Sequence, residues 1–327
     1  MKKLKAGVIG VGYLGRFHAQ KYAALEQVDL VGVADTEADR AKLVADECGC
    51  RAFTDFRELL PLVDCVSVAV PTSQHFDVAR QALAGGVDVL LEKPMTVTLE
   101  EADELIALAE EHQAILQVGH LERFNPAVLA LKPFLTTPVF IESSRISTFK
   151  RRGVDVDVVL DLMIHDIDII LTIIDSPLKT IHTVGAPVVT DTTDIANARL
   201  IFENGATANI TVSRVSLSTV RKMRIFQPGS YLNVDFAKKT IMTIELKGEL
   251  LESGMPRHET QVRSFAGEDA LFNEIAQFTA HVRERTKPEV SGVEGRRALA
   301  VVMQVIDQIK AHQSLDLYRK IQAAAVK

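Results

Sequence analysis

Short apolar runs alternate with longer amphipathic stretches over residues 5–120, and no other feature of the sequence constrains the fold as strongly. The runs are AGVIGVG, VDLVGVAD, VDCVSVAV, VDVLLEKP and AILQVGH, and stretches with helical periodicity, such as TLEEADELIALAEEHQ, lie between them. Apolar strands joined by helices of this length form right-handed βαβ units, in which a parallel sheet is buried on both faces. The first part of the chain is therefore predicted to be a doubly wound α/β domain.

This rhythm changes after about residue 121. Strand-like segments such as PVFIESSRIS, IANARLIFENG and ATANITVSRVS follow one another without long helices between them, and Asn204-Gly205 is a strong hairpin signal. A chain of 327 residues is long enough for two cores. We predict a parallel-sheet domain over residues 1–121 and a second α/β domain, with a large, mostly antiparallel open sheet, over residues 122–327.

Charge and cysteine usage exclude several classes of protein. A net charge of −6 gives no overall attraction to nucleic acid or to an anionic membrane. Charged residues interrupt the longest apolar stretch, so no membrane span is predicted. The three cysteines, Cys48, Cys50 and Cys65, lack the second pair of a metal finger and favour a reduced, cytoplasmic protein.

A glycine-rich turn follows the first apolar run. Gly10 permits a tight turn, Gly12 lets the backbone approach a pyrophosphate, and Gly15 allows the next helix to pack closely on the strand. Asp35 ends the second run about twenty residues later, where a carboxylate can accept hydrogen bonds from the adenosine ribose. The combination predicts a dinucleotide site, although an ordinary βα turn and a turn aspartate are the plainer alternatives.

Two further segments end apolar runs on the same side of the predicted sheet. Lys93, in LLEKP, ends the fifth run, and Pro94 disfavours a helical backbone there. Ligands bind at the carboxyl ends of strands in open parallel sheets, so Lys93 is a candidate site residue, with a solvated turn lysine as the alternative. Pro71-Thr72-Ser73 ends the preceding run, and its hydroxyls could simply cap a helix.

The segment DLMIHDID places ionisable side chains inside an otherwise apolar helix. Asp161, His165 and Asp168 fall within an arc of about 60°, which predicts a thin polar stripe lining a cavity. Asp166 lies off this stripe, and we expect it to have its own hydrogen-bond partner. The stripe could be a structural His–Asp pair, a metal site or a catalytic site, but no other dense His/Cys cluster supplies metal ligands.

A catalytic stripe would suit hydride chemistry. Histidine titrates near neutrality and can take the proton of a hydroxyl group while hydride leaves for a nicotinamide, and a neighbouring carboxylate orients the imidazole. An ammonium group such as that of Lys93 can stabilise the developing alkoxide.

Taken in order, these motifs resemble the Gfo/Idh/MocA oxidoreductases over essentially the whole chain. The resemblance implies a Rossmann domain, a second α/β domain with an open sheet, and a nicotinamide cofactor. It also implies oxidoreduction at a sugar or cyclitol carbon. Lys93 and His165 would be the catalytic pair, supported by Asp161. VGHLERFNPA and DLMIHDIDI look most like the branch acting on nucleotide-linked amino sugars such as UDP-N-acetylglucosamine.

The predicted site has a cofactor part and a substrate part, and no metal. The predicted cofactor residues are Gly10, Val11, Gly12, Tyr13, Leu14, Gly15, Asp35, Pro71, Thr72, His75, Glu92 and Lys93. The predicted substrate residues are Arg123, Asn125, Arg151, Arg152, Asp161 and His165. Since Asp35 repels a 2′-phosphate, NAD is expected in preference to NADP.

The cations Lys150, Arg151 and Arg152, in FKRRG, could hold the diphosphate of a UDP-sugar or could be a solvated surface. A dehydrogenase of a free sugar or inositol is the first alternative function. A non-redox protein that retains NAD, either a glycosidase or a sensor, is the second. A homodimer or homotetramer through the open sheet is expected because an exposed apolar sheet face generally marks an interface.

Overall fold

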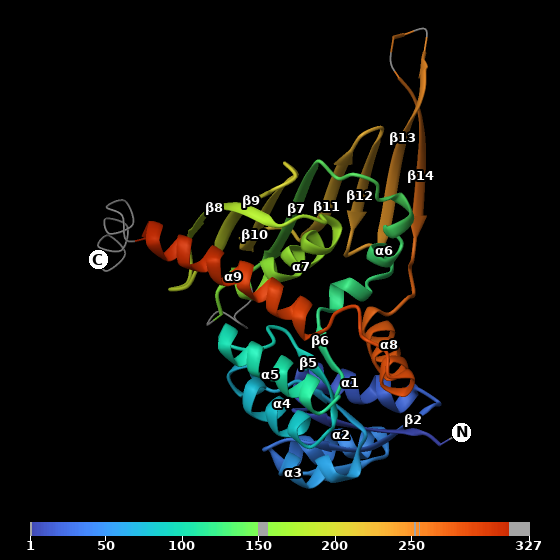
Figure 1. Ribbon diagram of the computed structural model, residues 1–327, viewed down its shortest axis with the longest axis vertical. Helices are drawn as coiled ribbons and strands as arrows, with labels where there is room; N and C mark the ends of the chain where they lie inside the picture. Colours follow the sequence, from blue (N-terminus) through green and yellow to red (C-terminus); the bar gives the residue numbers. More distant parts are fainter. Residues whose placement is uncertain (1, 150–155, 252, 255, 314–327) are drawn as a thin grey trace. The chain divides into compact units, whose positions relative to one another are not determined.

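The computed structural model describes residues 2–149, 156–251, 253–254 and 256–313 (Figure 1). The chain forms two compact units, Met1–Phe124 with Asp269–Leu299, and Asn125–Glu268 with Ala300–Lys327. The first unit is therefore built from two separate stretches of chain, whereas the sequence pattern predicted a single boundary after residue 121.

The first unit contains a six-stranded sheet in the order β3-β2-β1-β4-β5-β6. All of its strand pairs are parallel, so the predicted doubly wound sheet is confirmed. The order reverses between β1 and β4, which is the position where open α/β sheets bind ligands. The strands are β1 (Leu4–Ile9), β2 (Val28–Ala34), β3 (Arg51–Phe53), β4 (Cys65–Val68), β5 (Asp88–Glu92) and β6 (Leu116–Gly119).

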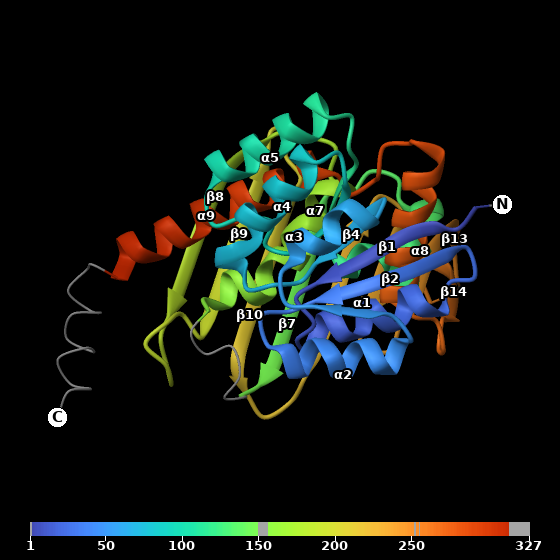
Figure 2. The same ribbon diagram turned by 90° about the horizontal axis from the view of Figure 1, so that it is seen from below.

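Helices cover both faces of this sheet. Figure 2 shows α1 and α2 on one side of the strands and α4 and α5 on the other. The α-helices of this unit are α1 (Tyr13–Ala24), α2 (Ala38–Cys48), α3 (Phe56–Leu59), α4 (His75–Ala84), α5 (Leu99–Glu111) and α8 (Ala270–Glu284). The short 3₁₀ turns are η1 (Leu60–Leu62), η2 (Thr72–Gln74) and η3 (Leu121–Phe124).

Helix α8 comes late in the chain but belongs to the first unit because of its apolar face. Leu271, Ile275, Phe278 and Val282 are buried in the same core as Tyr22 of α1. Asp269 caps the helix by accepting the backbone N–H groups of residues 271 and 272 at 3.0 and 3.2 Å. The apolar spacing of FNEIAQF predicted the helix, but periodicity alone does not say which core a helix joins.

The second unit contains an eight-stranded sheet in the order β14-β13-β12-β11-β7-β10-β9-β8. Only β7 and β10 pair in parallel, so the predicted mostly antiparallel open sheet is confirmed. The strands are β7 (Phe140–Thr148), β8 (Leu178–Ala186), β9 (Ile195–Phe202), β10 (Thr207–Ser216), β11 (Val220–Gln227), β12 (Ser230–Asp235), β13 (Thr240–Leu250) and β14 (Pro256–Ser264).

The helical segments of the second unit are α6 (Pro126–Leu129), η4 (Lys132–Phe134), a π-helical turn η5 (Val159–Met163) and α7 (Ile164–Ile173). Helix α9 (Gly292–Gln313) ends in this unit, where Gln308 donates to the carbonyl of Ile181 in β8 at 3.0 Å. Among the described residues, no helix combines the length and the apolar character needed to cross a bilayer.

The two faces of this sheet differ in character. Residues on one face of β7 and β10 are buried, including Ile141 and Ile210. The other face carries Ser, Thr, Asn and charged side chains, which line a cavity of about 520 Å³ that includes Glu142, Asn209 and Lys222. The expected apolar outer face is therefore wrong for this central region, because the strands alternate apolar and polar residues.

Candidate functional site

The glycine turn between β1 and α1 has the geometry expected of a phosphate-binding turn. Gly10 has φ +81°, and a Cβ there would lie 2.8 Å from the backbone nitrogen of Val70. A Cβ on Gly15 would lie 1.8 Å from the carbonyl oxygen of Gly10, so the helix packs too closely for any side chain. A Cβ on Gly12 meets nothing within 4 Å, which leaves the backbone open to a ligand.

This turn opens onto a cavity of about 800 Å³ within the first unit. The predicted cofactor residues Gly10, Gly12, Asp35 and Pro71 line it together. A volume of this size suits a cofactor-sized ligand, and the cavity lies at the carboxyl ends of β1, β2 and β4. The cavity lining also includes residues that the sequence pattern did not predict: Thr36, Glu37, Arg40, Arg57, Gln74 and Gln81.

Asp35 is held firmly at the end of β2. Its carboxylate accepts the backbone N–H of Val11 at 2.9 Å and that of Glu37 at 2.9 Å. Arg40 reaches the same two oxygens at 3.1 and 3.2 Å. The bond from Val11 couples the acid to the glycine turn, so Asp35 both shapes the turn and presents a carboxylate to the cavity.

Other predicted cofactor residues, among them Tyr13 and Thr72, are not part of the cavity lining. Tyr13 is 65% exposed and stacks edge-to-face on Phe17. Val11 is buried, Leu14 is half-buried at the start of α1, and Thr72 begins η2. A cofactor contact from each of these residues stays a prediction.

His75 is buried, and both of its ring nitrogens face backbone carbonyls, those of Pro94 at 2.8 Å and Val70 at 2.9 Å. Burial lowers the pKa of His75, although these carbonyls oppose the shift. The imidazole therefore ties the turn after β5 to the end of β4, and this role is structural. Lys93 is half-buried at the end of β5, and its backbone N–H donates to the Glu92 carboxylate at 3.3 Å.

The polar stripe of the second unit begins in a π-turn rather than in an α-helix. The N–H of Ile164 bonds the carbonyl of Val159, five residues earlier, so the spacing of about 100° per residue does not hold through Asp161. Asp161 is exposed, His165 is half-buried and Asp168 is buried. π-turns are frequent at functional sites, and this one carries the first member of the stripe.

The expectation that Asp166 has its own partner is confirmed. Its carboxylate accepts Arg145 Nε at 2.9 Å, Arg145 Nη2 at 3.1 Å and Ser143 Oγ at 2.9 Å. Arg145 and Asp166 are 3% and 1% exposed, so this is a bidentate ion pair inside the core. The pair fixes α7 on β7 and therefore fixes the neighbouring His165.

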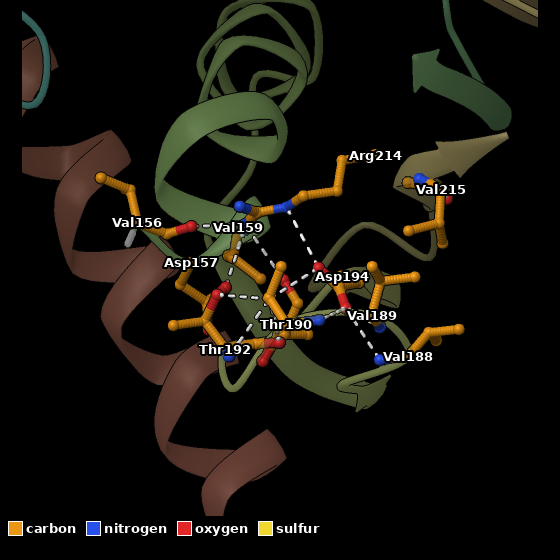
Figure 3. Close-up of polar contacts among 12 residues, drawn as sticks. Val156, Asp157, Val159, Val188, Val189, Thr190, Thr192, Asp194, Arg214 and Val215 are labelled. Carbon is orange, nitrogen blue, oxygen red and sulfur yellow. Dashed lines mark hydrogen bonds and ion pairs between the residues drawn. The ribbon is translucent and has the colours of Figure 1, made fainter. Parts of the chain in front are cut away.

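A second polar network holds the chain that leads into the π-turn (Figure 3). Asp194 accepts the backbone N–H groups of Val188, Val189 and Thr190 at 2.8, 2.6 and 2.8 Å. Burial raises the pKa of Asp194, but these donors outweigh burial and lower the pKa below its ordinary value. Arg214, paired with Asp194 at 3.5 Å, also donates to the carbonyl of Val156. The network anchors the residues just before Asp161.

The remaining predicted substrate residues have different settings. Arg123 lies in η3 of the first unit. Asn125 is buried and caps α6, because its side-chain oxygen accepts the N–H of Ala127 at 3.1 Å. Its side-chain Nδ2 donates to the backbone carbonyl of Phe236 at 3.2 Å. This gives Asn125 a structural role, and a substrate contact from it stays a prediction. Lys150, Arg151 and Arg152 lie outside the described residues.

The sequence pattern did not predict one buried cluster. His18, Glu92 and Glu274 lie together inside the first unit, although they come from α1, β5 and α8. A signal was present, since His18 and Tyr22 share the buried face of α1 and Glu274 lies among apolar residues in FNEIAQF. No spacing rule connects three positions so far apart in the chain.

A parallel βαβ sheet with a glycine turn, an acid after its second strand and a cavity between them defines a dinucleotide-binding protein of the Rossmann class. Family models extend this conclusion. Residues 4–120 match the oxidoreductase family with an NAD-binding Rossmann fold, and residues 142–227 match the GFO/IDH/MocA C-terminal domain. The chain belongs to the Gfo/Idh/MocA family of oxidoreductases.

Individual relatives of known sequence or structure support the same family membership. The chain is 42% identical over 312 residues to UDP-N-acetylglucosamine 3-dehydrogenase of Acidithiobacillus ferrooxidans, covering 95% of this chain and 99% of that protein. A solved structure of that enzyme superimposes with a TM-score of 0.91, covering 96% of this chain and 100% of the other. The scyllo-inositol 2-dehydrogenase (NAD(+)) of Bacillus subtilis is 26% identical, covering 91% of this chain and 92% of that protein.

Proposed function

We propose that this protein is an NAD-dependent dehydrogenase that oxidises a secondary hydroxyl group of a UDP-linked N-acetylhexosamine. The observation that carries the proposal is the 42% identity, over nearly the whole of both chains, to a relative named UDP-N-acetylglucosamine 3-dehydrogenase. Lys93, Asp161 and His165, whose catalytic roles the resemblance to the family implies, complete the proposal.

The cavity of the first unit suits the adenosine end of the cofactor. Gly12 leaves room for a pyrophosphate against the backbone at the start of α1, and the helix N-terminus favours its negative charge. Asp35 would accept the ribose hydroxyls, and its charge disfavours a 2′-phosphate, so NAD is proposed rather than NADP. When bound, the nicotinamide supplies the hydride acceptor.

Side chains of this protein would accept the hydroxyl proton and stabilise the charge that develops on the substrate oxygen. His165 would take the hydroxyl proton as hydride leaves the carbon, because imidazole titrates near neutrality. Lys93 would stabilise the developing negative charge on oxygen, and Asp161 would orient the substrate beside His165. The Arg145–Asp166 pair holds the first turn of α7, and Arg214, paired with Asp194, holds the carbonyl of Val156 ahead of the π-turn.

The substrate's diphosphate needs a cationic anchor, and Arg151 and Arg152 are our proposal for it. Arginine matches phosphate with two parallel hydrogen bonds, and a remote contact of this kind helps to position the reacting hydroxyl. The alternative substrate is a free sugar or inositol, which the scyllo-inositol relative favours and which would need no such anchor.

The test measures net NADH formation with UDP-N-acetylglucosamine, with free N-acetylglucosamine and with inositols, in parallel with thermal-shift binding of each ligand. We expect turnover and stabilisation with the UDP-sugar, since a ligand stabilises the fold in proportion to the logarithm of its concentration over Kd. Turnover with inositol alone would favour the alternative substrate. Binding without net NADH formation would favour an NAD-retaining glycosidase or a sensor.

We also propose a homodimer or homotetramer formed through the open sheet. The polar outer face described above would make such an interface through hydrogen bonds and ion pairs as well as through apolar area. Phe140, Phe226 and Tyr231 add an aromatic patch at one end of that face, with ring centroids 5.8 and 5.1 Å apart.

A further inference from the structure

A chain of buried polar groups lies beneath the Lys93 turn of the first unit. Tyr22 Oη is 2.9 Å from Ser67 Oγ, which is 3.0 Å from His18 Nδ1, and His18 Nε2 is 3.0 Å from Glu92 Oε1. The following arrangement of protons is one that satisfies every contact. Tyr22 donates to Ser67, Ser67 donates to Nδ1, and Nε2–H donates to an ionised Glu92. In this arrangement Glu92 accepts a hydrogen bond from His18 Nε2 at the end of the chain that faces Lys93.

Glu274 brings a second carboxyl group to this site from α8. It is fully buried, and its two carboxyl oxygens accept no hydrogen bond from any residue that the structure describes. Ligating atoms of Glu274, His18 and Glu92 all lie within 4.8 Å of one another. Burial, together with the charge of Glu92, raises the pKa of Glu274 well above its ordinary value.

Glu92 has little room to withdraw from Glu274. A Cβ on Gly119 of β6 would lie 2.9 Å from Glu92 Oε1, so the carboxylate packs directly on the backbone of the neighbouring strand. Its other oxygen accepts the N–H of Lys93. The titratable groups that face Glu274 are Glu92 on β5 and His18 and Tyr22 on α1. Two carboxylate charges so close together in a buried site are strongly unfavourable.

We propose that Glu274 is held as a neutral carboxylic acid that donates its proton to the Glu92 carboxylate, and that it is thereby a positioning residue for the Glu92–Lys93 turn. The Glu92 carboxylate then receives donors from His18, from the Lys93 backbone and from Glu274. Its orientation sets the backbone from which the Lys93 side chain leaves. The positioning role rests on the proposed function, in which Lys93 stabilises the reacting oxygen.

A divalent cation is the competing occupant of three ligating groups at this spacing. The orientation of His18 favours the proton instead. Its Nε2 faces a Glu92 oxygen at hydrogen-bond distance, and its Nδ1 faces Ser67, whereas a metal would need a nitrogen lone pair directed at the ion.

The first test is the pH dependence of stability. A raised carboxyl pKa means that the folded chain holds a proton that the unfolded chain releases, so stability falls as pH rises above the ordinary glutamate pKa. Glu274→Gln is permanently neutral, and its amide N–H can still donate to Glu92. The unfolding constant of the wild type, divided by that of Glu274→Gln, should rise by up to about tenfold per pH unit from about pH 5 upward, until the pH passes the raised pKa of the folded chain.

Glu284→Gln is the matched control, since Glu284 is exposed on the same helix. Its ratio to the wild type should stay constant across this range. A constant ratio for Glu274→Gln as well would show that Glu274 carries no proton in the folded chain and would overturn the proposal.

The second test separates positioning from packing. Glu274→Met keeps the length of the side chain but removes the donor to Glu92, and it should lower kcat about tenfold or more while NADH affinity stays unchanged. Glu274→Gln should keep kcat within about twofold of the wild type, because its amide restores the hydrogen bond. A folded Glu274→Met variant with the wild-type kcat would overturn the positioning role.

The two tests also distinguish this inference from the proposed function. Stability measurements need no substrate, so a constant ratio in an active enzyme refutes the inference alone. A pH-dependent ratio in a chain that is inactive on every UDP-sugar supports the neutral carboxyl group and counts against the proposed substrate. One equivalent of bound metal by mass spectrometry of the purified protein would overturn the proton assignment, and a metal-free protein supports it.

Discussion

Replacing Asp35 with serine should weaken NADH binding by roughly 10- to 150-fold and should bring NADPH to equal or higher affinity. Hydrogen bonds to a charged acceptor contribute about 1.5–3 kcal/mol, and each 1.4 kcal/mol is a tenfold change in Kd. The loss of one such bond to the ribose is sufficient for the lower limit. The serine also removes the charge that repels a 2′-phosphate.

Arg40 occupies the Asp35 carboxylate in the structure, so the ribose must compete with it. The Asp35 side chain is 4% exposed but the Arg40 side chain is 48% exposed, and an ion pair with one partner this open to water contributes about 1 kcal/mol. The ribose hydrogen bonds are stronger, so the cofactor should displace Arg40. The buried bond from the Val11 N–H, at 2.9 Å, keeps the carboxylate in place meanwhile.

Fluorescence titration would measure the affinity for NADH and for NADPH of four proteins: the wild type, Asp35→Ser, Arg40→Ala and the double variant. Arg40 released from Asp35 is expected to meet the 2′-phosphate, so the double variant should lose the NADPH gain of Asp35→Ser. Arg40→Ala alone should change NADH affinity by less than about threefold. An unchanged NADH affinity in Asp35→Ser would refute the assignment of Asp35 to the ribose.

Three further predictions concern catalysis, stability and assembly. His165→Asn and Lys93→Ala should each lower kcat by about 10²-fold or more while NADH still binds, since general acid–base catalysis contributes ~10²–10⁴; near-normal turnover in either variant would return that residue to a structural role. Asp166→Asn should destabilise the fold by about 3–5 kcal/mol, because Arg145 would remain buried without its counter-charge, and calorimetry should show the melting temperature of the second unit falling by roughly 6–20 °C; a fall of under about 2 °C would mean that the pair adds little. Light scattering at micromolar concentration should give a dimer or tetramer mass, and a monomer would contradict assembly through the open sheet.

The parallel sheet was predictable because its signals are local. Each apolar run is short and bounded by turn residues, and the glycine spacing ties the first run to a helix. The membership of α8 was not predictable in this way. The apolar face of α8 indicates that the helix is buried. Which of the two cores it joins depends on residues far apart in the sequence, such as Phe278 and Tyr22, which lie about 250 positions apart but in the same core.

The parts of the candidate site that the sequence predicted are those where a residue type at a given spacing implies a single geometry. Gly10 has the turn conformation and Gly15 the close helix packing that their spacing predicted, and Asp35 lines the same cavity as Gly10. The π-turn at Asp161 was missed because the hydrophobic pattern of π and α turns is alike over five residues. Arg40 was missed because an exposed helical arginine is ordinary in sequence and becomes informative only beside a carboxylate.

The split composition of the first unit bears on how the protein is made. A ribosome releases residues 1–124 long before residues 269–299, so the nascent dinucleotide-binding sheet lacks the packing of Leu271, Ile275 and Phe278 until nearly the whole chain has been synthesised. Domains generally fold as units during synthesis, and this unit must wait for its last helix while the intervening strands emerge. A fragment ending at residue 124 would expose that unfilled core, and a minimal cofactor-binding fragment needs α8 joined back to it.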